Sequence, residues 1–151
     1  MRFPRVRRFL EGAFDVVLLQ EHWRIPGRPR DLDELGLIPH AERGGDAGLA
    51  LFTRHRVLEK AHASFRAGAA HWLERRFSRK GWQHVALEVD GERVDVINTH
   101  LEAHAAPKHA RVRSAQIDEL LTVAAGLTGA VVLAGDFNLY ARAPDELTTD
   151  V

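Results

Sequence analysis

The sequence predicts a layered α/β (α+β) domain with a mixed β-sheet. Residues 82–101, WQHVALEVDGERVDVINTHL, alternate apolar and polar residues on both sides of Asp90-Gly91, a pair typical of a tight hairpin turn. A helical pattern over residues 107–125 then separates this hairpin from the apolar run AVVLAG at residues 130–135. Some strands are therefore hairpin neighbours and others are separated by a helix, which favours layers of helix and mixed sheet.

The elements before the hairpin follow from local patterns. Residues 4–14 place apolar side chains at helical intervals and predict a short helix that Gly12 closes. The run DVVLLQ at residues 15–20 has the length and the continuous apolar character of a strand covered on both faces. Residues 24–30 hold two prolines and a glycine and predict a loop, and GLALFT at residues 48–53 predicts another short strand.

The pattern predicts that the helix over residues 107–125 begins at Pro107 and stops at Gly126. Its apolar residues are expected to face the core: Val112, Ile117, Leu120, Leu121 and Ala124. The run at residues 130–135 is then expected to be the last strand.

Composition indicates one soluble domain that spans residues 1–151. The chain is 45% hydrophobic and 28% charged, and its 21 basic and 21 acidic residues cancel, so no overall field draws it to nucleic acid or to an anionic membrane. It has no cysteine, which excludes disulfides and thiolate chemistry. No signal peptide and no membrane-spanning run is evident. We expect a cytoplasmic monomer without stable membrane insertion.

Three predicted strands end in polar residues that can bind a metal or handle a proton. These ends are Gln20-Glu21-His22, the run from Asn98 to Glu102, and the run from Gly135 to Asn138. Ligand sites in layered α/β folds gather where strand ends open into loops. Carboxylate and amide oxygens are the ligands that Mg²⁺ or Mn²⁺ prefers, and a histidine adds a titratable group.

Each of these groups also has a simpler interpretation. A Gln-Glu pair after a strand can be the start of a solvated loop, Asp-Phe-Asn can be a turn held by its own side chains, and a single histidine can be structural. The joint occurrence at three strand ends favours a functional site. A zinc site at residues 100–104, HLEAH, is disfavoured because Leu101 stands where a metalloprotease motif needs glutamate. The basic residues Arg75, Arg76, Arg79 and Lys80 either guide a phosphate or form a solvated loop.

These motifs resemble those of the endonuclease/exonuclease/phosphatase superfamily, the DNase I-like proteins. The similar segments are DVVLLQE, GLALFTRH, VINTHLEA and VVLAGDFN, with Arg113 and Gln116 on the helix before the last of them. The stretch FSRKGWQHVAL is similar to the Lys-Gly segment of the neutral sphingomyelinase-like branch. The resemblance implies a partial four-layer αββα sandwich. It also implies a divalent-metal-dependent phosphoesterase that hydrolyses a phosphodiester, or a phosphomonoester, by activated water.

The resemblance assigns a role to four residues. Glu21 matches the ligand of the essential cation, Mg²⁺ or Mn²⁺. Asp136 matches the residue that orients or deprotonates the attacking water, and Asn138 matches one that steadies a phosphate oxygen. His100 matches the histidine that donates to the phosphate or assists the leaving group. The substrate implied is a phosphodiester in nucleic acid, inositol phosphate or a sphingomyelin-like lipid headgroup.

The chain departs from the family pattern at both ends. The family's first strand carries an asparagine near the metal, and its last strand carries an Asp-His pair; neither has a counterpart in residues 1–151. We therefore expect a domain that lacks the first strand and the C-terminal third, with weak activity at best. The alternative is a catalytically incompetent fragment or an interaction remnant of such an enzyme.

Overall fold

The computed structural model describes residues 14–22, 38–39, 47–67 and 80–139, which form two β-sheets and one helix. The first sheet contains β1 (Val16–Leu19), β2 (Ile38–Pro39) and β3 (Ala50–Thr53) in the order β1-β3-β2, all antiparallel. The second contains β4 (Arg56–Ser64), β5 (Gly81–Val89), β6 (Glu92–His100) and β7 (Ala130–Asp136) in that order. In this sheet β6 and β7 are parallel and the other pairs are antiparallel.

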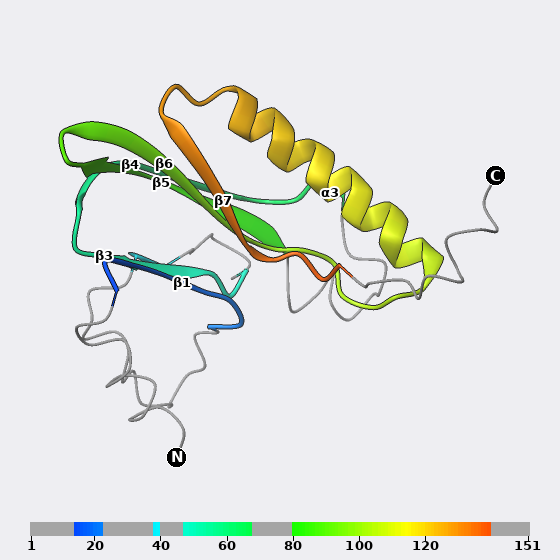
Figure 1. The fold of residues 1–151 in the computed structure, drawn as a ribbon. Helices are drawn as coiled ribbons and strands as arrows, with labels where there is room; N and C mark the ends of the chain where they lie inside the picture. The colour runs from blue at the N-terminus through cyan, green and yellow to red at the C-terminus, as the bar shows by residue number, and fades with distance from the viewer. Residues whose placement is uncertain (1–13, 23–37, 40–46, 68–79, 140–151) are drawn as a thin grey trace, which may run out of the picture.

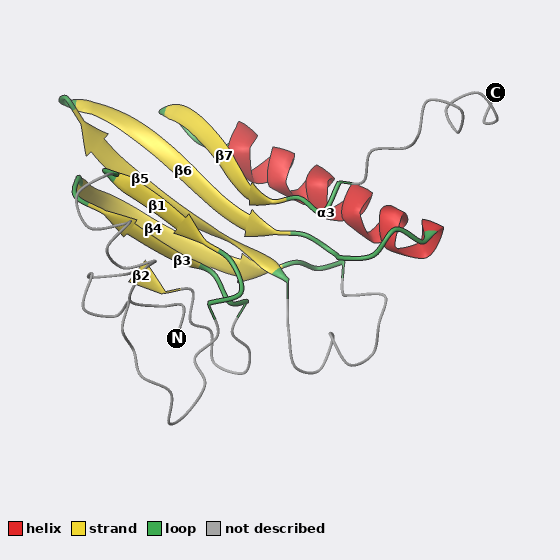
Figure 2. Ribbon diagram, turned by 60° about the horizontal axis from the view of Figure 1, so that its bottom comes forward, coloured by secondary structure: helices red, strands yellow, loops and turns green. Residues whose placement is uncertain are grey.

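The two sheets face each other, and α3 (Pro107–Ala125) lies on the outer face of the larger sheet (Figures 1 and 2). The arrangement confirms the predicted fold class, with two sheet layers and one outer helical layer among the described residues. The helix predicted for residues 4–14 and the loop predicted for residues 24–30 lie outside the described residues.

Two apolar cores hold the layers together. The core between the sheets is built around Leu51, Val85, Leu87 and Val96. The core between the larger sheet and α3 is built around Phe65, Ile97, Leu101 and Leu120. Each such side chain stabilises the fold by roughly 1.5–3 kcal/mol when fully buried. Because β6 contributes to both cores, its C-terminal half is buried on both faces.

The hairpin and the long helix are confirmed. Asp90 and Gly91 both adopt positive φ angles, of 51° and 84°, which is the geometry of the tight turn that the sequence predicts. Helix α3 has proline in its first turn and Gly126 as its C-cap. One detail of the helix was wrong: Leu121 is 55% exposed, while Leu120 is completely buried. Successive helical residues differ by about 100° in direction, so the two leucines point in different directions, and here only Leu120 faces the sheet.

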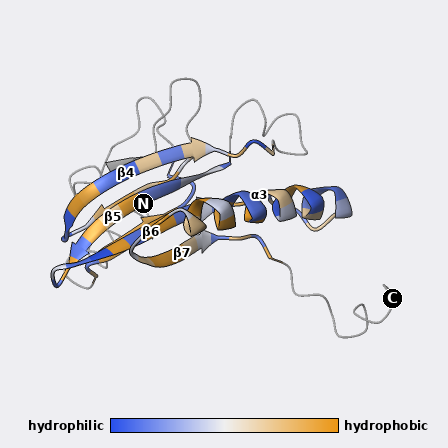
Figure 3. Cartoon of the chain, turned by 90° about the horizontal axis from the view of Figure 1, so that it is seen from above, coloured by the Kyte–Doolittle hydropathy of each residue, from blue (hydrophilic) through white to orange (hydrophobic). Residues whose placement is uncertain are grey.

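Strand β4 is an element that the sequence analysis missed. Its residues, RVLEKAHAS, are mostly exposed, and β4 forms one edge of the sheet. Figure 3 shows hydrophilic and hydrophobic residues mixed along the strand. Pairing with β5 from Ser64 to Arg56, rather than an apolar pattern, defines this strand.

Within the described segments, no helix combines the length and the apolar composition that a membrane crossing requires.

Candidate active site

Three of the four predicted site residues lie together where β1, β6 and β7 end. The parallel register of β6 and β7 pairs His100 with Asp136, and the two side chains approach to 3.5 Å between Nε2 and Oδ2. The N–H of Leu101 extends this pairing by donating to the Asp136 carbonyl at 2.9 Å. Burial and the charge of Lys80 lower the pKa of His100, and the carboxylate of Glu21 lies close enough to oppose this lowering electrostatically.

The fourth residue, Asn138, is tied to the same strand ends by two hydrogen bonds. Its backbone N–H donates to Asp136 Oδ1 at 2.9 Å, and its Nδ2 donates to the Leu101 carbonyl at 2.9 Å. Its φ angle of 48° is in the left-handed region, which asparagine tolerates better than most residues. The turn therefore fixes the carboxylate and the amide relative to each other, and the Asn138 amide keeps a second N–H for another acceptor.

Gly135 is the residue that brings this turn so near to β6. Its φ angle is 142°, and a Cβ atom there would lie only 2.0 Å from the Thr99 carbonyl oxygen. Backbone atoms of a paired strand cannot move away without breaking the sheet. The glycine before Asp136 is thus a requirement of the close β6–β7 contact.

A pair of amide side chains, Asn98 and Gln20, connects the two sheets beside Glu21. Asn98 is fully buried, accepts a hydrogen bond from Gln20 Nε2 at 2.7 Å, and donates to the carbonyls of Leu19 and Ala50 at 3.1 and 3.2 Å. These bonds fix the end of β1, after which Glu21 turns outward with a φ angle of 57°. The sequence analysis noted both amides at strand ends but assigned them no role.

Lys80 is the close cationic neighbour of His100. It is 7% exposed, and its Nζ lies 2.8 Å from His100 Nε2. Burial lowers the pKa of His100, and the charge of Lys80 lowers it further, against the opposing effects of Asp136 and Glu21. The imidazole is therefore neutral near pH 7. The other basic residues of the predicted cluster, Arg75, Arg76 and Arg79, lie outside the described residues.

Helix α3 holds the segment that follows β6. Gln116 accepts from the Glu102 N–H at 2.8 Å, and Arg113 donates to the carbonyls of Glu102 and His104 at 3.0 and 2.6 Å. The buried Glu102 carboxylate lies 2.5 Å from His109 Nδ1. Residues 101–104 are not helical, so His100 and His104 do not share a helix face, and the helical zinc motif does not form.

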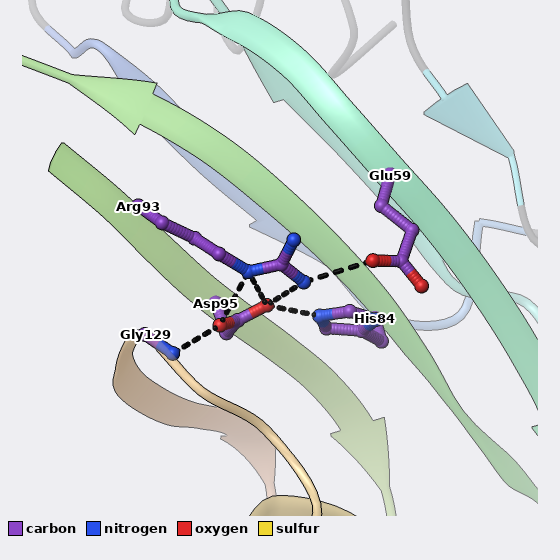
Figure 4. Close-up of polar contacts among 5 residues, drawn as sticks. All are labelled: Glu59, His84, Arg93, Asp95 and Gly129. Atoms are coloured by element: carbon purple, nitrogen blue, oxygen red, sulfur yellow. Dashed lines mark hydrogen bonds and ion pairs between the residues drawn. The ribbon is translucent and has the colours of Figure 1, made fainter. Parts of the chain in front are cut away.

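A second polar cluster, which we call the Asp95 clamp, consists of Glu59, His84, Arg93, Asp95 and the N–H of Gly129 (Figure 4). Asp95 is fully buried and receives bonds from Arg93, from His84 at 2.7 Å and from Gly129 at 3.0 Å. These contacts lower the pKa of Asp95 to about 2, the Arg93 bond first among them. Asp95 lies five residues before His100, about 16 Å along β6. The clamp therefore joins β4, β5, β6 and the loop before β7, and it lies at a distance from the candidate site.

The metal ligand expected at the site is a single carboxylate. Glu21 is exposed at its strand end and offers a hard oxygen next to the site. Among the described residues, no group of three or more histidine, aspartate or glutamate side chains is arranged to hold a metal ion. Mg²⁺ is commonly bound by one or two carboxylates with water and substrate phosphate completing its shell, so the donor set fits such a cation.

A sequence comparison identifies the family of the chain. The sequence profile of the Endonuclease/Exonuclease/phosphatase family matches residues 3–146. The chain belongs to this family. No curated protein sequence matches the chain.

Three solved structures illustrate the family fold. Sphingomyelinase C from Streptomyces griseocarneus superposes with a TM-score of 0.71 at 24% identity, covering 97% of this chain and 60% of that one. A beta toxin mutant from Staphylococcus aureus with bound magnesium ions gives 0.72 at 19% identity, covering 91% and 56%. TDP2 from D. rerio, complexed with a single-strand DNA product, gives 0.68 at 21% identity, covering 93% and 54%. The chain thus spans just over half the length of these proteins.

Proposed function

We propose that this site hydrolyses a phosphodiester with the help of a divalent cation and an activated water molecule. The observation that carries the proposal is the convergence of Glu21, His100, Asp136 and Asn138 from three strand ends that are far apart in sequence. Family membership and the superposition on a sphingomyelinase and on a DNA-bound protein support the same reaction class.

The side chains are suited to distinct steps. The Asp136 carboxylate is half exposed, so it can accept a proton from water. The water oxygen then bonds to phosphorus as one phosphorus–oxygen ester bond breaks. The remaining amide N–H of Asn138 can donate to a phosphate oxygen. Neutral His100, fixed next to Asp136, can donate a hydrogen bond to the phosphate or to the leaving oxygen.

Glu21 is the proposed ligand of Mg²⁺ or Mn²⁺. When bound, such a cation would offset the negative charge that repels a nucleophile from an anionic phosphodiester. The Gln20–Asn98 amide pair fixes the strand end that presents this carboxylate. A solved beta toxin with bound magnesium ions has the same fold, which supports this assignment.

Hydrolysis of bis-p-nitrophenyl phosphate tests the reaction. We expect turnover that depends on added Mg²⁺ or Mn²⁺ and falls at least ~100-fold in Asp136→Asn, the usual scale for loss of a general base. Asp118→Asn is the matched control, since Asp118 is an exposed carboxylate on α3. Turnover that is equal in Asp136→Asn and in the wild type would refute the assignment.

A thermal melt separates the enzyme from its alternative, a non-catalytic remnant. A cation that binds the folded chain raises the melting temperature by mass action, and Glu21→Gln should abolish the rise. Glu92→Gln, which removes an exposed carboxylate in the hairpin, should leave it intact. A melting temperature that does not respond to either cation, together with no turnover, would favour the remnant.

A further inference from the structure

The contact between Lys80 and His100 has a chemical consequence for the proposed site. A lysine ammonium can only donate hydrogen bonds. Its Nζ lies 2.8 Å from His100 Nε2, so this nitrogen must be the acceptor. A neutral imidazole carries one proton, and that proton must then lie on Nδ1.

This tautomer is not the one that the rest of the site favours. His100 Nδ1 is buried and has no hydrogen-bond partner among the described residues, so its proton is unsatisfied there. A proton on Nε2 would instead face Asp136 Oδ2, which lies 3.5 Å away. Leaving a buried donor unsatisfied is unfavourable, so only a strong competing contact holds the proton on Nδ1.

We propose that Lys80 is a positioning residue whose ammonium keeps His100 Nε2 as a hydrogen-bond acceptor. When an anionic phosphoryl group binds, the ammonium leaves His100 and donates to the phosphoryl oxygens instead. This inference rests on the proposed function and names the step by which phosphate prepares the site. Phosphate oxygens form charge-assisted bonds with lysine that are stronger than a bond to a neutral ring nitrogen. A proton then leaves Nδ1 for solvent and one binds Nε2, so the net charge of the ring does not change. His100 Nε2 becomes a donor only when there is a phosphoryl group to receive it.

The position of Lys80 allows this exchange. It immediately precedes β5, and Gly81 is paired with His100 across the strands, so its backbone is fixed at the site. The Thr99 hydroxyl donates to the Gly81 carbonyl at 3.0 Å and strengthens the pairing. The flexible lysine stem can therefore move its ammonium while the backbone stays in place.

Nitrogen-15 NMR of the metal-free, histidine-labelled chain tests the proposal, with the His100 signals assigned by their loss in His100→Gln. We expect the Nδ1–H tautomer in the wild type and in Lys80→Arg. In Lys80→Met, and in the wild type saturated with inorganic phosphate, we expect the Nε2–H tautomer. Phosphate should bind Lys80→Met about 10-fold or more weakly, as expected for one lost charge-assisted bond.

Lys60→Met is the matched control, because it removes an exposed lysine of the same sheet and should behave as the wild type. Circular dichroism establishes that each variant is folded. An Nε2–H tautomer in the phosphate-free wild type, or an unchanged Nδ1–H tautomer in folded Lys80→Met, would overturn the proposal. The readout needs no turnover, so a chain that fails to hydrolyse the diester can still confirm or overturn the role of Lys80.

Discussion

The Asp95 clamp gives the sharpest quantitative test of how this fold is held together. Asp95 is fully buried, and its carboxylate is held by Arg93, His84 and the N–H of Gly129. The pKa falls from 3.8 to about 2. At 1.36 kcal/mol per pKa unit, this difference corresponds to roughly 2 kcal/mol of stability. The substitution Asp95→Asn removes that charge and should lower the free energy of unfolding by about this amount at pH 7.

The direction in which the pKa of Asp95 shifts determines how the stability of the fold changes with pH. A carboxyl group whose pKa is lower in the folded state contributes its full stability above the unfolded value of 3.8. The contribution declines as the pH falls below that value and is lost below about pH 2. At pH 3 the stability contribution of Asp95 is smaller by about 1 kcal/mol. The difference in unfolding free energy between the wild type and Asp95→Asn should therefore be about 1 kcal/mol smaller at pH 3 than at pH 7.

Urea unfolding at pH 7 and at pH 3, followed by tryptophan fluorescence, measures this gap. Glu88→Gln is the control, since its ion pair with Arg56 is exposed and should be worth less than about 1 kcal/mol. A gap between wild type and Asp95→Asn that is the same at both pH values would show that the charge of Asp95 does not stabilise the fold. An effect no larger than that of Glu88→Gln would refute the calculation as well.

Three further substitutions test the packing around the site. Asn98→Leu leaves Gln20 and two carbonyls without their partner, and each unsatisfied group costs about 1–3 kcal/mol, measured by the fall in the urea midpoint. Leu120→Ala should cost about 2–5 kcal/mol, whereas Leu121→Ala on the exposed side of α3 should stay within about 0.5 kcal/mol in the same assay. Gly135→Ala would place a Cβ atom 2.0 Å from the Thr99 carbonyl oxygen, whereas the Cβ atom of Gly126→Ala would make only ordinary contacts. We therefore expect Gly135→Ala to melt at a temperature well below that of Gly126→Ala. Equal melting temperatures would contradict the close approach of Gly135 to Thr99.

Much of the candidate site could be predicted from the order of residues along the chain. An apolar strand followed at once by polar residues places those residues at a sheet edge, whatever the details of packing. Glu21, His100, Asp136 and Asn138 all follow this rule, and the structure brings them together. Contacts between side chains from different strands do not follow from local order. The approach of Lys80 to His100 and the three bonds of Asn98 depend on register and on the stacking of the sheets.

By itself, the sequence determined the elements with strong periodicity or turn chemistry. The hairpin at Asp90-Gly91 and the helix from Pro107 to Ala125 are examples, because alternation, a turn pair and a terminal proline act within a few residues. Only the tertiary structure decided where β4 pairs, which helical leucine is buried and how Asp95 is neutralised. Those outcomes depend on which residues of other strands and loops come near, or on which face of an element a neighbouring layer covers, and a local pattern records neither.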